Sequence, residues 1–134
     1  MTFQKLKYFV FSHNDIAGIN LGKFTSKDGF KLEDINRLST FFFNGHLHNE
    51  FCRDNLINVG NLTGQNFSED AFSYNHRIYV LHIHDETQET YLECYENPYA
   101  FNFYKLDKFS DLDRLKKNSV VTVKCFEEDY NIWK

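Results

Sequence analysis

The chain has 134 residues, of which 42% are hydrophobic, 18% aromatic and 25% charged. This composition excludes a disordered protein, and the length suits one domain, or part of one, with its own core. The net charge of −4 and a pI near 5.8 argue against a protein that binds nucleic acid through its charge alone. They do not exclude a nuclease, because bound divalent cations supply positive charge at such a site.

The sequence also indicates where the protein resides. It has no apolar run near the roughly 18 residues of a membrane span, and its first residues lack the apolar core of a signal peptide. Its three cysteines (Cys52, Cys94 and Cys125) show no Cys-x-x-Cys spacing and indicate free thiols rather than disulfides or a zinc site. We therefore expect a soluble cytoplasmic protein with no membrane partner.

The first part of the chain predicts a strand–helix–strand unit. A largely apolar run at 5–12 predicts a buried strand, and a loop at 14–22 and a turn at 26–30 follow it. Apolar residues at helical spacing predict a helix at 31–38, and three phenylalanines predict a second buried strand at 40–43. Strands joined in this way run parallel, so their carboxyl ends lie at the same edge of the sheet.

The rest of the chain predicts mostly strands. A short strand at 55–60 leads into a turn at 61–66 and a loop at 67–75. Residues 77–84 and 89–96 predict the two strands of a β-hairpin, which Pro98 closes. Beyond it the pattern predicts three further elements, a strand at 100–106, a helix at 110–117 and a strand at 120–125. The fold class is therefore mixed α/β.

Histidines follow two of the predicted strands. His13 comes after the first, and His46 and His48 come after the second, beyond Gly45. If the chain stays extended past Gly45, His46 and His48 face the same side with backbones about 6.5–7 Å apart. That spacing suits two imidazoles that reach two metal ions about 3.5–4 Å apart. The parallel strands should bring His13 to this pair, although a His-x-His pair also arises by chance as ordinary surface residues.

Three imidazoles are too few for a two-metal site, because each ion takes about four to six ligands. The nearby candidates for further ligands are Asn14, Asp15, Glu50 and Asp54. For Asp15, ordinary turn preferences favour a solvated loop residue or a helix cap over a ligand.

The remaining histidines predict no second site. His82 and His84 alternate with apolar residues and should share a solvated face of the hairpin, while His76 marks the entry to a strand. The glycines at 60 and 64 lack the lysine and hydroxyl residue of a phosphate loop.

Three short segments resemble the calcineurin-like metallophosphoesterases. They are Phe-Ser-His-Asn at 11–14, Asn-Gly-His-Leu-His at 44–48 and Asn-Val-Gly-Asn-Leu-Thr at 58–63. Within that superfamily the chain resembles the DNA-repair and recombination exonuclease branch, the phage and bacterial nuclease subunit that works with an SMC-like ATPase. The resemblance covers roughly residues 5–106, and the Gly-His-x-His element is its most specific part.

The resemblance implies a fold and a site. Residues 1–106 would be the C-terminal half of the metallophosphoesterase domain, a β-sandwich flanked by helices with a β-hairpin toward the C-terminus. Residues 107–134 would begin an accessory domain that caps the nuclease and holds DNA. His13 and His46 would bind one ion and His48 the other, usually Mn²⁺. The same likeness places four residues at the border of the site: Asn14, Gly45, Gly60 and Asn61.

The resemblance also implies a function, for which part of the family's site is missing from this chain. The family's first half supplies an Asp-x-His, a bridging Asp and a Gly-Asn-His-Asp motif, and none of these occurs here. The chain is therefore expected to contribute to a manganese-dependent DNA nuclease that hydrolyses phosphodiester bonds, in the host cytoplasm if phage-encoded, and to be inactive alone. An N-terminal half on another polypeptide, or a homodimer partner, would complete it. The alternative is a catalytically inactive remnant or a binding module that pairs with another chain.

Overall fold

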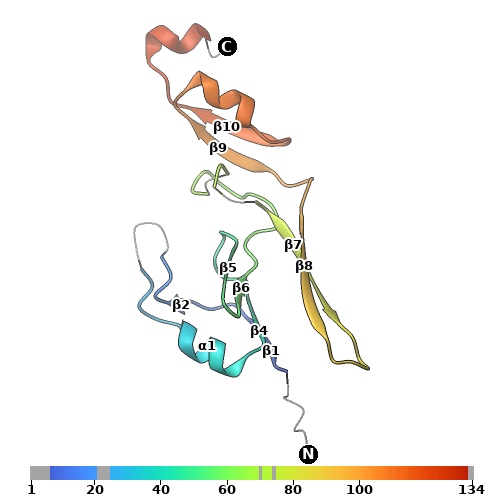
Figure 1. The fold of residues 1–134 in the computed structure, drawn as a ribbon. Coiled ribbons are helices and arrows are strands. Elements are labelled where there is room, and N and C mark those ends of the chain that lie inside the picture. Colours follow the sequence, from blue (N-terminus) through green and yellow to red (C-terminus); the bar gives the residue numbers. More distant parts are fainter. Residues whose placement is uncertain (1–6, 21–24, 70, 74, 133–134) are drawn as a thin grey trace, which may run out of the picture. The chain divides into compact units, whose positions relative to one another are not determined.

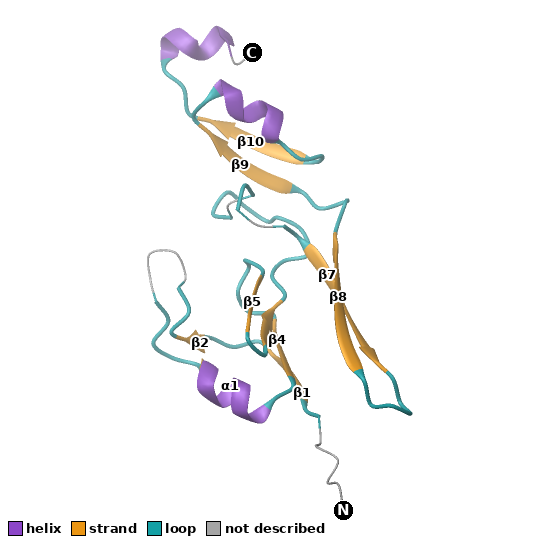
Figure 2. Cartoon of the chain, in the orientation of Figure 1, coloured by secondary structure: helices purple, strands orange, loops and turns teal. Residues whose placement is uncertain are grey.

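The computed structural model describes residues 7–20, 25–69, 71–73 and 75–132. They form a mixed α/β structure in which strands predominate, as Figures 1 and 2 show. The chain divides into two compact units, Met1–Asn61 and Leu62–Lys134. The expected boundary between residues 106 and 107 falls inside the second unit.

The first unit is built on a four-stranded sheet with the order β1-β4-β6-β5. Strands β1, β4 and β6 run parallel, and β5 runs antiparallel to β6. The bounds are β1 Phe9–Ser12, α1 Leu32–Leu38, β4 Phe41–Asn44, β5 Phe51–Arg53 and β6 Leu56–Asn58. This arrangement confirms the predicted strand–helix–strand unit, so the carboxyl ends of β1, β4 and β6 lie at one edge.

The core of the first unit contains residues from α1 and from the sheet. Ile35 of α1 belongs to one buried cluster with Phe42 of β4 and Leu56 of β6, and Ile16 and Ile19 complete it. Each such apolar side chain stabilises the fold by about 1.5–3 kcal/mol when fully buried. The helix is therefore attached to the sheet by Ile35 and the partly buried Leu32, whereas Leu38, which has the same spacing, is 59% exposed.

Three short strands of the first unit lie where the sequence predicted none. β2 (Ile16–Ala17) lies in the predicted loop and pairs in parallel with β3 (Phe30–Lys31), which covers the last residue of the predicted turn and the first of the predicted helix. β5 was also not expected. Strands of two or three residues are too short to leave a period-two pattern. The first predicted strand starts at Phe9 rather than at residue 5. Residues 5–6 of that strand and 21–22 of the predicted loop lie outside the described residues.

The second unit contains a ribbon and a pair of parallel strands. β7 (Arg77–Ile83) and β8 (Thr90–Glu96) form the predicted antiparallel hairpin. β9 (Asn102–Leu106) pairs in parallel with β10 (Ser119–Val123), and a short 3₁₀ helix, η2 (Glu127–Ile132), follows. None of the described helices is long and apolar enough to cross a membrane.

The helix predicted at 110–117 is instead a 3₁₀ helix, η1 (Phe109–Arg114). Leu112 lies within η1, and Leu115 is its C-cap with an extended backbone. Both leucines pack against the buried cluster of Ala71, Tyr104 and Leu106, so the segment reaches the core although the helix ends at Arg114.

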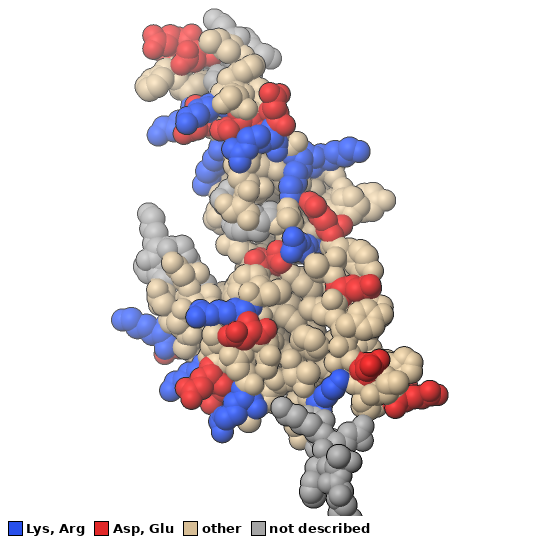
Figure 3. Space-filling model, viewed as in Figure 1, with Lys and Arg blue, Asp and Glu red and all other residues tan. Residues whose placement is uncertain are grey.

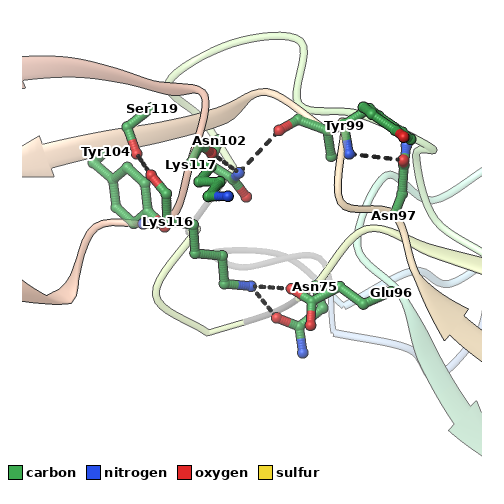
Figure 4. A network of polar contacts seen from close by, with 10 residues as sticks. Asn75, Glu96, Asn97, Tyr99, Asn102, Tyr104, Lys116, Lys117 and Ser119 are labelled. Carbon is green, nitrogen blue, oxygen red and sulfur yellow. Dashed lines mark hydrogen bonds and ion pairs between the residues drawn. The ribbon is translucent and has the colours of Figure 1, made fainter.

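A polar network fixes the loops around β9 and β10 (Figure 4). The buried amide of Asn102 donates to the backbone oxygens of Ala100 and Lys117, each at 3.1 Å. Lys116 Nζ donates to Glu96 Oε1 at 3.0 Å and also to Asn75 Oδ1. The loop before β10 is thereby tied to the end of β8 and to the loop that precedes β7.

Candidate functional site

The predicted site residues lie just beyond the carboxyl ends of β1, β4 and β6. His13 directly follows β1, Gly45 directly follows β4, and Gly60 comes two residues after β6. The backbone pairing continues past the strand ends, because Gly45 N donates to Ser12 O at 3.0 Å and Val59 N donates to Asn44 O at 3.0 Å. Three loops therefore start side by side at this edge of the sheet.

His13 and His46 meet at this edge. Their ring centroids are 5.0 Å apart and the rings stand at 79° to each other, edge to face. His46 Nε2 also lies 3.4 Å from Asp15 Oδ1, and both of these side chains are nearly half exposed. The expected approach of the two histidine-bearing strand ends is confirmed for this pair. Asp15 does not cap α1, whose N-cap is Lys31.

His48 takes a different course from the one its spacing suggested. The strand ends at Asn44 and the chain bends through residues 46–49, so the extended path that would place His46 and His48 on the same side is not followed. The His48 side chain is exposed, and its backbone oxygen accepts a hydrogen bond from Asn61 N at 2.9 Å. Within the described ranges, no three His, Cys, Asp or Glu side chains gather in a group that could hold a metal ion.

The donors at this edge match manganese in type but not in number. Imidazole nitrogens and a carboxylate oxygen are ligands that such an ion accepts. Two imidazoles and one carboxylate are fewer ligands than a two-metal site needs, and no catalytic step follows from these residues alone.

Two buried asparagines lie beneath the histidine-bearing loops. Asn44 and Asn58 are the last residues of β4 and β6, they pair in register, and both are 0% exposed. Asn44 Nδ2 donates to Asn58 Oδ1 at 3.1 Å. Asn58 Nδ2 in turn donates to the backbone oxygens of Leu47 and Asn49, at 2.8 and 2.7 Å.

The other end of this network reaches the loop that carries His13. Asn44 Oδ1 accepts from the backbone N–H of Asn14 and from the hydroxyl of Ser12, each at 3.1 Å. Sequence reasoning gave Asn44 and Asn58 no role in the site. The sequence did contain a signal for this role, since an asparagine ends each of two apolar runs. An amide that is buried at the end of such a run requires hydrogen-bond partners.

Of the two glycines expected to border the site, only Gly60 is required by its surroundings. Its φ is +67°, and a Cβ there would lie 2.7 Å from Glu50 N and 2.9 Å from His48 O. A Cβ on Gly45 would lie 3.5 Å from His13 Nδ1, an ordinary contact. Gly60 therefore allows the close approach of its loop to the backbone that follows His46.

The hairpin histidine His82 belongs to a polar cluster rather than to a simply solvated face. His82 Nε2 lies 2.7 Å from Glu93 Oε2, and its ring stacks on Tyr91 with centroids 4.3 Å apart. The Tyr95 hydroxyl donates to the same carboxylate oxygen at 2.7 Å. The hydrogen bonds from Tyr95 and His82 lower the pKa of Glu93, and Glu93 raises the pKa of Tyr95. His84 is exposed, and the buried His76 directly precedes β7, as predicted for a strand entry.

Acidic and basic side chains are interspersed on the side of each unit that Figure 3 shows. Cys52, Cys94 and Cys125 are free and exposed.

No protein-family model, no curated protein and no solved structure matches this chain. The resemblance of the three short segments to metallophosphoesterases therefore stays a prediction from the sequence.

Proposed function

We propose that this chain is one part of a metal-dependent phosphodiesterase that acts on DNA, of the calcineurin-like metallophosphoesterase type used in DNA repair or recombination. One observation carries the proposal, namely the edge contact between His13 and His46 at the carboxyl ends of two adjacent parallel strands. Open α/β sheets bind their ligands at this position. The Asp15 carboxylate, 3.4 Å from His46, adds an anionic oxygen donor of the type that metal ions accept.

In the proposed assembly this chain contributes ligands and another polypeptide contributes the rest. His13, His46 and His48 would hold the ions, with Asn14, Gly45, Gly60 and Asn61 around them. Two Mn²⁺ ions would lower the pKa of a water molecule and neutralise phosphate oxygens. The remaining ligands would come from an N-terminal half or from a second copy of the chain. An SMC-like ATPase would be the further partner, in the cytoplasm.

A second candidate function is a binding module that pairs with another chain without catalysis. β1 is an edge strand of its sheet, and edge strands can accept a further strand. It also carries aromatic rings that stack on those of β4, with centroids 6.2 Å apart for Phe9 and Phe41 and 5.1 Å apart for Phe11 and Phe43. Phe11 is 74% exposed at this edge, which favours a protein partner.

The two candidates are separated by Mn²⁺ titration calorimetry on the whole chain, alone and mixed with a candidate N-terminal half. For the nuclease we expect binding in the mixture, its loss in His46→Ala and its retention in His84→Ala, since His84 lies in the hairpin. The mixture should also cleave DNA. If the mixture forms a complex that binds no Mn²⁺, or if His46→Ala binds as the wild type does, the metal site is wrong and the binding module remains.

A further inference from the structure

We propose that Asn44 and Asn58 are positioning residues. Their side chains form an amide bridge, meaning the hydrogen bond between them together with the bonds each makes to a loop. This bridge fixes the loop after β1 to the loop after β4, and it thereby sets the contact between His13 and His46. The inference rests on the proposed function for the identity of the ligand, but the bridge itself is a property of the protein without metal.

The direction of every hydrogen bond in the bridge follows from its two ends. The backbone oxygens of Leu47 and Asn49 can only accept, so Asn58 must present its NH₂ group to them. Its remaining oxygen faces Asn44, which must therefore donate. The oxygen of Asn44 is then left to accept from the backbone N–H of Asn14. Each hydrogen bond is therefore donated in the same direction, from the loop after β1 toward the loop after β4.

Only an amide of this length satisfies the bridge. An aspartate at either position has no donor to offer, a serine is too short to span the gap, and a leucine offers neither donor nor acceptor. Both side chains are completely buried, so no bulk water replaces a missing partner. Every buried side-chain nitrogen or oxygen in the described part of the chain has a hydrogen-bond partner. A substitution of Asn58 would therefore leave the backbone oxygens of Leu47 and Asn49 without a donor, and a substitution of Asn44 would leave Asn58 Oδ1 without one, each at a cost in stability.

The bridge contacts the backbone beside each of the three histidines. Asn14 directly follows His13, Leu47 lies between His46 and His48, and Asn49 directly follows His48. Asn58 thus holds the second loop at two points, and Asn44 holds the first loop at one. Because these bonds form within the protein, the two imidazoles are in place before an ion arrives. A preorganised pair of ligands lowers the ordering cost of binding.

Asn55 supplies a matched control in the same strand region. It precedes β6, and its Nδ2 donates to the backbone oxygens of Asn36 and Ser39 at 3.2 and 2.8 Å. Like Asn58, it therefore gives one NH₂ group to two carbonyls. Its partners belong to α1 and the residue after it, at the opposite end of the parallel strands from the histidines. Asn55→Ser removes the same kind of bonds without touching either histidine-bearing loop.

The first test is NMR spectroscopy of the full chain without metal. The wild type should show a nuclear Overhauser cross-peak between the ring protons of His13 and His46. Asn58→Ser should lose that peak and shift the amide signal of Asn14, which Asn58 reaches only through Asn44, while Asn55→Ser should keep both. Asn44→Asp, which is isosteric but cannot donate, should lose the cross-peak too. Unchanged cross-peaks in Asn58→Ser and Asn44→Asp would overturn the bridge.

A wild-type measurement keeps the inference testable if the variants fail to fold. The side-chain NH₂ protons of Asn58 should exchange with solvent far more slowly than those of the exposed Asn118. Equal exchange rates would overturn the bridge.

The second test is Mn²⁺ affinity in the completed assembly. It should fall about 10- to 100-fold in Asn58→Ser, the usual effect of removing a residue that orients a metal ligand, and stay unchanged in Asn55→Ser. Equal affinities in wild type and Asn58→Ser would overturn the positioning role. No Mn²⁺ binding by any sample, with the cross-peak pattern as expected, would refute the proposed function and leave the bridge in place.

Discussion

Gly60→Ala should destabilise the first unit more than Gly18→Ala, although both glycines have a positive φ. The values are +67° for Gly60 and +82° for Gly18. An alanine in this left-handed region costs about 1–2 kcal/mol. The loss of glycine's freedom in the unfolded chain offsets about 0.4–1 kcal/mol of this. Both contributions are common to the two variants and cancel in the comparison.

The surroundings of the two positions separate the variants. Among the described residues, a Cβ on Gly18 would have no heavy atom within 4 Å, whereas a Cβ on Gly60 would lie 2.7 Å from Glu50 N and 2.9 Å from His48 O. Those atoms are backbone and cannot rotate away, so residues 48–50 must shift. Such overpacking costs typically about 1–3 kcal/mol. We therefore expect Gly60→Ala to lose about 1–3 kcal/mol more of the free energy of unfolding than Gly18→Ala.

Hydrogen exchange of the β4 and β6 amides in the full chain is the suitable assay. It reports on the first unit by itself, which matters because two compact units need not unfold together. The Asn61 amide, which donates to His48 O, should lose protection in Gly60→Ala. Equal losses of stability in the two variants, within about 0.5 kcal/mol, would refute the steric argument, because that is the usual scatter of independent substitutions.

Two further predictions concern the core and the hairpin. Phe42→Ala should cost the first unit about 3–5 kcal/mol because the ring is 4% exposed, whereas Phe11→Ala, at 74% exposed, should cost less than about 1.5 kcal/mol, both measured by the same hydrogen exchange. Equal costs would contradict the burial of Phe42. Because Tyr95 and His82 lower the pKa of Glu93, the carboxylate stabilises the hairpin above the ordinary glutamate pKa, and that contribution is lost as the pH falls through the lowered pKa. Tyr95→Phe should raise the pKa of Glu93 in a ¹³C NMR titration, and an unchanged midpoint in that variant would remove the hydrogen bond as the cause.

The sequence predicted the elements whose side chains repeat at the period of their backbone. The phenylalanines of β4, the apolar positions of α1 and the alternation along β7 and β8 each extend over enough residues to show a period. The meeting of His13 and His46 followed from the parallel strands, because parallel neighbours end at the same edge. Local pattern and simple topology were sufficient for these features.

The features that were missed depend on partners distant in the chain. β2 and β3 are two residues each and exist because they pair with each other. The extended path expected through His46 and His48 was wrong because the chain bends through residues 46–49. A strand pattern does not predict where the following loop turns. Asn44 and Asn58 are polar residues in apolar surroundings, and their role depends on a contact across 14 residues. The ligand roles of His13, His46 and His48 stay a prediction.

Because Asn44 directly precedes Gly45, the unfolded chain is prone to deamidation at this position. In a flexible Asn-Gly pair, the glycine nitrogen attacks the side-chain carbonyl, ammonia leaves, and water opens the resulting succinimide to aspartate or isoaspartate. In the folded protein the nitrogen of Gly45 donates to Ser12 O, and the Asn44 carbonyl accepts two hydrogen bonds. Folding therefore protects this amide from deamidation. A chain that deamidates while unfolded carries a carboxylate at position 44, and it can no longer donate to Asn58 when it refolds.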